Sequence, residues 1–214
     1  MQIDPAKLEL SERYKLLIGA VVPRPIAWVS TVSEAGAANL APFSFFNAIS
    51  AEPFTLLFCP ANKPDGTEKD TLINIAETGE FVVNVVNESQ ALAMSATAEG
   101  LPLGESEFGY AGLDQAPSSV VKPPRVAGAP VSYECRVREI IRMAPGQPNG
   151  GNVVIGEIAS VHVDDEIIDD RYRIDPEKLA AVGRMAGFGY CSTRHRVDIP
   201  WGEQALNASA PEFE

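Results

Sequence analysis

The chain of 214 residues carries 17 Lys and Arg against 29 Asp and Glu, so its formal net charge is −12. The electrostatic field of such a net negative charge repels polyanions, which argues against a nucleic-acid or anionic-membrane partner. A local site for one small anion remains compatible with this net charge. The length suits one large domain, and 45% hydrophobic residues suffice for a substantial core. No run approaches the roughly 20 apolar residues that a membrane helix needs.

The cysteines point to a reducing compartment. Cys59, Cys135 and Cys191 are odd in number, far apart and without CxxC spacing, which argues against a disulfide framework or a zinc site. The first residues contain neither the basic region nor the apolar stretch of a secretory signal. We therefore expect a cytoplasmic protein.

The first half of the chain predicts a helix followed by closely spaced strands. A short helix begins near Ser11, where apolar residues recur at helical spacing, and Pro23 ends it. A β-branched and aromatic run predicts a strand over 26–32, followed by a turn at Glu34-Ala35-Gly36. Further strands are expected near 37–41, 44–50, 55–59 and 81–86, with a helix over 70–78 before the last.

A helix over 89–98, with Leu92 on its apolar face, is expected to end at Gly100. From 99 to 129 the chain carries repeated Gly and Pro without periodicity. This predicts a long ordered loop or flap, and loops of such length in a compact domain usually serve a function.

Two long strands follow the loop. Tyr133, Cys135 and Val137 alternate with charged residues, which predicts one buried and one solvated face. Residues 152–163 are apolar on both faces, as in a barrel or a covered sheet. Many short strands with few helices predict a mainly β fold with α decoration, forming one domain over 1–214 with its core at about 14–201.

The segments after the last long strand are mostly polar. Five carboxylates between 164 and 170 lack the ligand spacing of a calcium loop, and we interpret them as a solvated turn. A helix is expected from Pro176 to Val182, because proline suits the first helical position. A polar tail occupies 202–214.

Several enzyme classes lack their motifs here. His162 and His195 are the two histidines, and neither a G-x-S-x-G nor an H-E-x-x-H motif occurs, so hydrolase and metalloenzyme interpretations have little support. Neither G-x-G-x-x-G nor the P-loop pattern occurs. By itself, His162 fits a hydrogen-bonded strand histidine and His195 fits a solvated basic patch.

One segment has the composition of a phosphate cradle. Residues 62–71 follow a predicted strand and open a predicted helix. They combine backbone N–H groups at a helix N-terminus with two lysines and two threonines: Lys63, Thr67, Lys69 and Thr71. The alternative interpretation is an ordinary charged turn between a strand and a helix.

A second segment, residues 39–50, interleaves Asn and Ser with Phe43, Phe45 and Phe46. Amide and hydroxyl groups beside flat apolar surfaces suit a planar heterocycle with polar edges. A hairpin with a core aromatic cluster has the same composition, so the residues alone leave both interpretations open.

Taken together and in order, these motifs resemble the flavin reductase-like family of FMN-binding split barrels. The matching segments are RPIAWVSTVS at 24–33, Gly36, 39–50, Lys69-Asp70-Thr71, Asn74-Ile75, FVVN at 81–84, 156–165 with His162, and VGRMAG at 182–187 with Tyr190. The resemblance extends from about Tyr14 to Trp201.

The resemblance implies an FMN-binding split β-barrel that forms a homodimer, with the flavin near the subunit interface. It implies an NAD(P)H-dependent flavin reductase, in which hydride passes from NADH or NADPH to flavin N5 and nearby donors stabilise the charge that develops at the N1/C2=O edge. The alternative is a flavoredoxin-like electron carrier without a nicotinamide site of its own, reduced by a partner protein. An oxygenase or another electron acceptor is the partner expected downstream.

The resemblance also assigns residues. Ser30 and Thr31 are expected at the ribityl or phosphate region, and the isoalloxazine would be lined by Asn39, Ala41, Ser44, Phe45, Phe46 and Asn47. The phosphate would be bound by Thr67, Lys69 and Thr71, helped by Lys63, with Asp70 orienting the loop. Near the flavin ring or the nicotinamide we expect His162, Arg184 and Tyr190. Several basic residues thus lie in or beside the segments assigned to flavin or nicotinamide, which predicts a small cationic pocket on an otherwise acidic protein.

Overall fold

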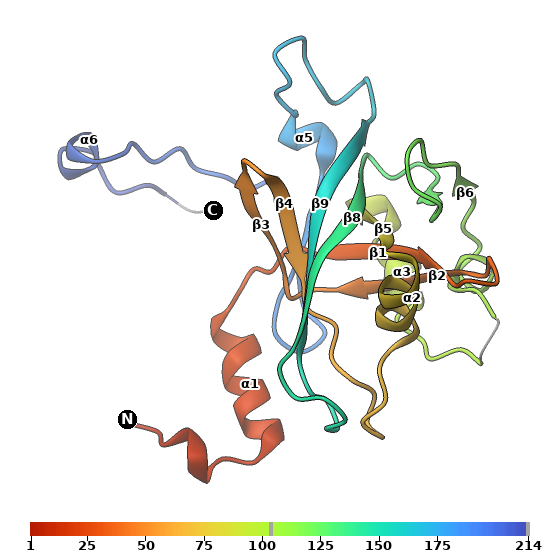
Figure 1. Cartoon of the computed structure of the whole chain (residues 1–214). Coiled ribbons are helices and arrows are strands. Elements are labelled where there is room, and N and C mark those ends of the chain that lie inside the picture. The colour runs from red at the N-terminus through yellow and green to blue at the C-terminus, as the bar shows by residue number, and fades with distance from the viewer. Residues whose placement is uncertain (103–104, 213–214) are drawn as a thin grey trace.

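The structure is a computed structural model that describes residues 1–102 and 105–212. Leu103 and Gly104, within the predicted 99–129 loop, and Phe213 and Glu214, at the end of the predicted tail, lie outside the described residues. The centre of the molecule is a seven-stranded antiparallel sheet in the order β2-β1-β5-β8-β9-β4-β3 (Figure 1). The mainly β fold predicted from the sequence is confirmed.

The seven strands of the sheet and helices α1 and α2 match the predicted ones to within a few residues, whereas β6, β7, β10, β11, α4 and α6 were not predicted. The sheet contains β1 (Ala27–Val32), β2 (Ala38–Phe43), β3 (Phe46–Ala51), β4 (Phe54–Phe58), β5 (Glu80–Val85), β8 (Val131–Arg142) and β9 (Asn152–Val163). Two smaller pairs are β6 (Gln115–Ala116) with β7 (Arg125–Val126), and β10 (Val182–Arg184) with β11 (Tyr190–Ser192). The helices are α1 (Leu10–Ala20), α2 (Asp70–Thr78), α3 (Ala91–Ala96), α4 (Glu107–Tyr110), α5 (Pro176–Leu179) and α6 (Glu203–Leu206), with 3-10 turns η1 (Pro5–Lys7) and η2 (Glu88–Gln90).

Two helix predictions were wrong in detail. The helix beginning at Pro176 ends at Leu179, because Ala180 has a left-handed backbone and Val182 already belongs to β10. The helix expected over 89–98 is divided into η2 and the shorter α3, and it buries Met94, whereas Leu92 is 87% exposed. No helix of the described ranges is long and apolar enough to cross a membrane.

A two-residue connection determines how the sheet closes. The outermost strands of the sheet order, β2 and β3, are joined only by Ser44 and Phe45, so the sheet must curl until its two edges meet at this corner. The interior of the curled sheet is apolar and contains the rings of Phe43, Phe58 and Phe81. The centroid of the Phe58 ring lies 5.1 Å from that of Phe43 and 5.4 Å from that of Phe81. The strand apolar on both faces, β9, takes part in this closure by pairing with β8 and with β4.

The prediction of a solvated face along β8 was wrong at Glu134, which is 1% exposed. Its carboxylate accepts hydrogen bonds from the backbone N–H groups of Ser119 and Val120 at 2.7–3.0 Å. These residues belong to the predicted flap, which therefore covers part of the sheet. This covering segment explains why Glu134 is buried although the alternation of residues along β8 predicts that it faces solvent.

The described part of this segment that follows the gap, residues 105–129, packs against the sheet. Phe108, Val126 and Ala129 join Trp28 and Leu40 in a second apolar cluster on the outer side of the sheet. Polar anchors add to this, because the Asn84 amide oxygen accepts the N–H of Val126 and the Ser30 hydroxyl donates to the carbonyl of Pro124. Residues 105–129 of the predicted loop thus cover β1, β2 and β5.

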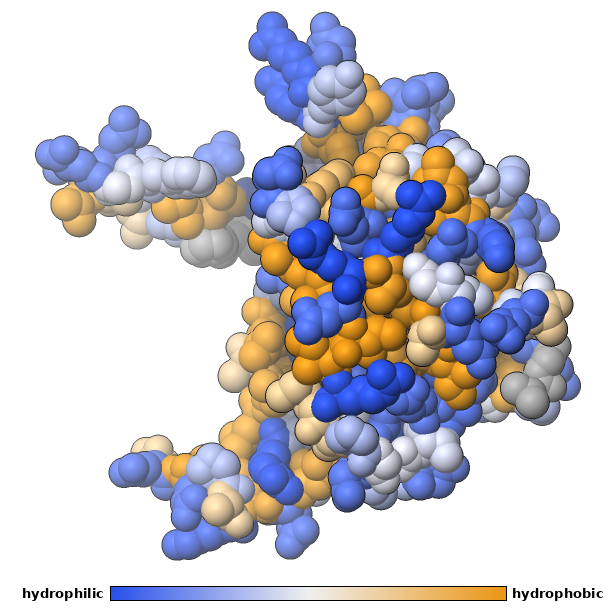
Figure 2. Space-filling view, viewed as in Figure 1, coloured by the Kyte–Doolittle hydropathy of each residue, from blue (hydrophilic) through white to orange (hydrophobic). Residues whose placement is uncertain are grey.

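Two segments extend from the body of the molecule. Figure 1 shows the N-terminal segment with α1 and the C-terminal segment with α6 as separate arms on one side of the sheet. No residue of α1 is buried, although Leu10, Tyr14, Leu17 and other apolar residues lie on it. Figure 2 shows apolar surface along α1 and on the neighbouring face of the body. In the part of the chain that the structure describes, the arms therefore leave apolar side chains exposed.

Gly156→Ala is expected to lower the free energy of unfolding by about 1–3 kcal/mol, the usual cost of overpacking a core. Gly156 lies in β9 with its Cα facing the core, and an added Cβ would overlap the ring of Phe81. Denaturant unfolding measures the change. Gly151→Ala is the matched control because nothing lies within 4 Å of the added Cβ, so an equal loss in both variants would contradict this packing argument.

Candidate functional site

The corner between β2 and β3 is held by one buried arginine. Arg24 is 5% exposed, and its guanidinium lies 5.8 Å from the centroid of the Phe45 ring. Burial lowers the pKa of this guanidinium. At 2.8–3.2 Å it donates to the Ser44 hydroxyl and to the carbonyls of Ile18, Val21 and Met185. Arg24 therefore joins the end of α1, the corner and the chain after β10.

The corner itself presents half-buried side chains. Ser44, Phe45 and Phe46 are each partly exposed, and the carbonyl of Phe45 accepts the N–H of Cys59 at 2.8 Å. Ala41 is also partly exposed, whereas Asn47 is exposed and accepts a hydrogen bond from the N–H of Ala48. The predicted aromatic segment thus has both a core part, at Phe43, and a surface part that a planar ring can approach.

The amino end of α2 lacks a side-chain cap. Its N-cap residue is Lys69, whose side chain makes no capping hydrogen bond. Among the described residues, no acceptor binds the N–H groups of Asp70 and Thr71. Free N–H groups at the positive end of a helix, next to a lysine, are the donor set that a phosphate group takes.

The loop that leads into α2 is fixed by the tip of the β8–β9 hairpin. Arg142 donates to both carboxylate oxygens of Glu68 at 2.5 and 3.2 Å, and the Asn152 amide donates to the Asn62 side chain at 2.9 Å. Gly66 has φ of +88° and its Cα lies against the carbonyl of Gly146, which leaves no room for a side chain. The loop is thereby held before any ligand binds.

Three predicted ligand hydroxyls lie inside the protein. Ser30 and Thr31 are 0% exposed and Thr71 is 1% exposed. Thr31 accepts from the Asn74 amide at 3.0 Å, and Thr71 accepts from the Asn39 amide at 3.1 Å. Thr31 and Thr71 therefore tie β1 and β2 to α2, Ser30 ties β1 to the covering segment, and none of the three lines the surface of the site.

Ion pairing reduces the positive charge of the predicted cradle. Lys63 pairs with Asp70 at 2.9 Å, and the Thr67 hydroxyl donates to Asp65 at 2.6 Å. These hydrogen bonds from Thr67 lower the pKa of Asp65. Within the described ranges, Lys69 forms no ion pair. Lys69 is thus the cation of the loop that remains available for an anion.

The residues expected near the nicotinamide separate into two groups. The Arg184 guanidinium lies 4.6 Å from the centroid of the Tyr190 ring, and the backbone of Arg184 bridges to Arg24 beside the corner. His162 is exposed on β9, eight residues beyond Val154, which is paired with Phe58 near the corner. At about 3.3 Å per residue this is about 26 Å along the strand. One chain therefore brings Arg184 and Tyr190 to the corner but not His162.

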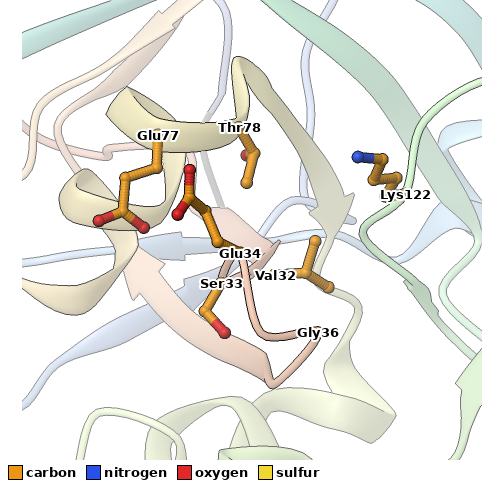
Figure 3. Close-up of a pocket in the computed structure, with 7 residues that line it drawn as sticks. All are labelled: Val32, Ser33, Glu34, Gly36, Glu77, Thr78 and Lys122. Atoms are coloured by element: carbon orange, nitrogen blue, oxygen red, sulfur yellow. The ribbon is translucent and has the colours of Figure 1, made fainter.

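Two other polar regions lie apart from the corner. Figure 3 shows an open hollow at the far end of β1 and α2, where Glu34 and Glu77 face Lys122 across the opening. It contains none of the predicted ligand residues. The acidic run at 164–170 forms turns in which Asp169 pairs with Arg173 at 2.7 Å. Over 1–102 and 105–212, no three His, Cys, Asp or Glu side chains are grouped to hold a metal ion.

Several residues that hold the site were not predicted from the sequence. Arg142 and Asn152 fix the α2 loop across more than 70 residues of sequence, and Glu107 on α4 binds the backbone of β2. None belongs to a local motif. Glu107 carries no sequence signal, because its role arises only when the 99–129 segment packs on β2.

Comparisons with known proteins identify the family of the chain. A family model described as "Flavin reductase like domain" matches residues 19–176. The uncharacterized protein BH2278 of Halalkalibacterium halodurans is 44% identical over 192 residues, which cover 89% of this chain and 91% of that protein.

Solved structures show the same fold. Nitrilotriacetate monooxygenase component B from Bacillus cereus has a TM-score of 0.88 and 33% identity, covering 93% of this chain and 98% of its own. The 2-nitrobenzoate 2-nitroreductase NbaA of Pseudomonas fluorescens has a TM-score of 0.85 and 32% identity, covering 95% and 97%. A putative flavin reductase with split barrel domain from Shewanella frigidimarina has a TM-score of 0.80 at 24% identity, covering 94% and 100%, which supports the split-barrel fold alone.

Proposed function

The chain belongs to the flavin reductase-like family, and on that premise we propose that it binds FMN and reduces it with NADH or NADPH. The observation that carries the proposal is the uncapped amino end of α2 beside Lys69, which the Asn39–Thr71 hydrogen bond links to β2, the strand that ends at the half-buried aromatic corner. The first feature fits a phosphate and the second fits a flat ring. Bound FMN would supply the ring that accepts hydride.

The protein's own residues would bind and orient. Lys69 and the N–H groups of Asp70 and Thr71 would hold the phosphate, with Lys63 acting through Asp70. Backbone groups of the β2–β3 corner would line the ring. The further predicted residues of this site are Ser30, Thr31, Asn39, Ala41, Ser44, Phe45, Phe46, Asn47 and Thr67, of which the buried hydroxyls would act as supports.

Arg184 and Tyr190 would form the nicotinamide side of the site. The guanidinium lies over the Tyr190 ring next to Arg24, so this pair offers a cationic, aromatic surface beside the corner. Two rings stacked against such a surface exclude water from the space between them, and no side chain has to act as a nucleophile.

The visible spectrum under anaerobic conditions tests the proposal. The protein loaded with FMN is expected to bleach on addition of NADH or NADPH. A protein that stays colourless after incubation with FMN would contradict flavin binding. An FMN-loaded protein that bleaches with a reduced ferredoxin-type donor but with neither nicotinamide would identify an electron carrier, the alternative favoured by the separation of His162 from the corner in one chain.

We further propose that the protein is a homodimer. The supporting observation is the exposed apolar surface on α1, together with the C-terminal arm, in which Trp201 is 90% and Leu206 is 83% exposed. Standard interfaces bury about 800 Å² per partner, and apolar residues so exposed rarely remain unpaired. Light scattering is expected to give twice the mass of one chain, and Leu17→Asp with Trp201→Asp is expected to give monomers.

His162→Ala is expected to leave the FMN dissociation constant within a few-fold and to slow reduction by NAD(P)H. His162 lies far along β9 from the corner of its own chain, so its contribution would be made at the corner of a second copy. Stopped-flow bleaching gives the rate, and His195→Ala is the control. Unchanged reduction kinetics in His162→Ala would remove His162 from the site.

The component B similarity suggests the acceptor. We propose that the reduced flavin or its electrons pass to a monooxygenase component, as the name of the Bacillus cereus relative indicates for that protein. Coupled turnover with candidate oxygenase components tests this step separately from flavin reduction.

A further inference from the structure

The edge strand of the candidate site is held by a buried carboxylate from the covering segment. Glu107, on α4, is 7% exposed, and its Oε2 accepts the N–H of Leu40 on β2 at 2.9 Å. β2 is the terminal strand of the sheet order, so this N–H points away from β1. An unpaired N–H at a sheet edge is normally left to solvent, and here a charged side chain takes it.

The contact continues directly to the amino end of α2. Asn39, the residue before Leu40, donates its amide to the hydroxyl of Thr71 at 3.1 Å. Thr71 lies in the first turn of α2, where the free N–H groups are found. Glu107 also lies near Asp70, and burial together with the Asp70 charge raises the pKa of Glu107. A fixed β2 therefore fixes the position of the helix start.

From these contacts we infer that Glu107 is a positioning residue for the phosphate end of the flavin, acting through Leu40, Asn39 and Thr71 without touching the ligand. The inference rests on the proposed FMN site. Burying a carboxylate costs free energy unless the carboxylate is hydrogen-bonded, so Glu107 and the edge of β2 hold each other in place. Phe108, 1% exposed in the outer apolar cluster, keeps α4 in register beside β2.

The chain offers a matched control. Glu134 is a second buried carboxylate that binds the same covering segment, but at Ser119 and Val120, where no predicted ligand residue lies. Substitution of either glutamate by alanine removes an anchor of the segment. Only Glu107→Ala also releases the strand next to α2.

The test measures binding of FMN and of riboflavin, which lacks the phosphate, by fluorescence titration. Glu107→Ala is expected to weaken FMN binding about tenfold and riboflavin binding less than about threefold. Glu107→Gln keeps an acceptor for the Leu40 N–H and is expected to restore FMN binding to within about threefold of the unmodified protein. Glu134→Ala is expected to change both affinities equally. Equal losses for the two ligands in Glu107→Ala, or no rescue by glutamine, would overturn the inference.

Hydrogen exchange of the ligand-free protein separates this inference from the proposed function. Peptides covering residues 38–43 are expected to exchange faster in Glu107→Ala than in Glu134→Ala, because only the first exposes the Leu40 amide. If the unmodified protein binds neither flavin, the proposed function fails. In that case unchanged exchange at 38–43 would show that Glu107 does not fix β2, and faster exchange would show that it does.

Discussion

Lys69→Ala is expected to weaken FMN binding by about ten- to a hundredfold and to leave riboflavin binding within about twofold. The difference is expected because only FMN carries the phosphate, and a charge-assisted contact to it contributes about 1.4–2.8 kcal/mol. Lys69 is the cation of the α2 loop without an ion-pair partner among the described residues, whereas Lys63 is paired with Asp70. Fluorescence titration of the two flavins measures both dissociation constants.

The helix itself should tolerate the Lys69 substitution, because the Lys69 side chain makes no capping hydrogen bond. Lys122→Ala is the matched control, since Lys122 lines the hollow at the opposite end of α2. Equal losses of FMN and riboflavin affinity in Lys69→Ala would show that this end of α2 is not the phosphate site. A loss in Lys122→Ala would instead indicate a general effect of charge.

Arg24→Ala is expected to lower the free energy of unfolding by about 3 kcal/mol and to abolish tight flavin binding. Hydrogen bonds to charged groups contribute about 1.5–3 kcal/mol each, and removing a buried donor leaves its acceptors without partners. Arg24 binds the carbonyls of Ile18 and Met185 and the Ser44 hydroxyl, so three segments lose a shared anchor. Denaturant unfolding and flavin titration measure the two effects.

Arg24→Lys tests whether geometry or charge matters. A lysine keeps the charge, but its single ammonium lacks the planar fork that serves several acceptors at once. We therefore expect Arg24→Lys to reduce the free energy of unfolding and the flavin affinity nearly as much as Arg24→Ala does. Arg13→Ala, an exposed arginine on α1, is expected to leave unfolding and flavin binding unchanged. Full stability in Arg24→Lys would indicate that charge alone accounts for the role of Arg24.

The elements that the sequence predicted well are those with local signals. β9 was predicted at its observed limits, with apolar residues on both of its faces. α2 was also predicted at its observed limits, after a charged loop, and in the structure Gly79 ends it with a left-handed backbone. The corner at Ser44 and Phe45 lies two residues further along the chain than the gap between the strands predicted over 37–41 and 44–50.

The contacts that hold the site together could not be predicted from local pattern. Glu134 looked solvated because alternation along β8 contains no information about the segment that covers it. Thr31 and Thr71 looked available to a ligand because the sequence does not reveal the partners of their hydroxyls. These partners, Asn74 and Asn39, are brought close only by the tertiary fold. Alternation and motif spacing report the neighbours of a residue along the chain, whereas burial depends on the segments packed against it.

The bare apolar face of α1 has a thermodynamic consequence. Eleven residues are too few for a stable isolated helix in water. Among the described residues Arg24 anchors the end of α1 but no residue of the helix is buried, so α1 needs further packing for its stability. If a second copy supplies it, mass action links the secondary structure of the arm to protein concentration. On dilution, α1 would then unfold before the barrel. The melting temperature of α1 would rise with protein concentration, whereas that of the sheet would stay constant.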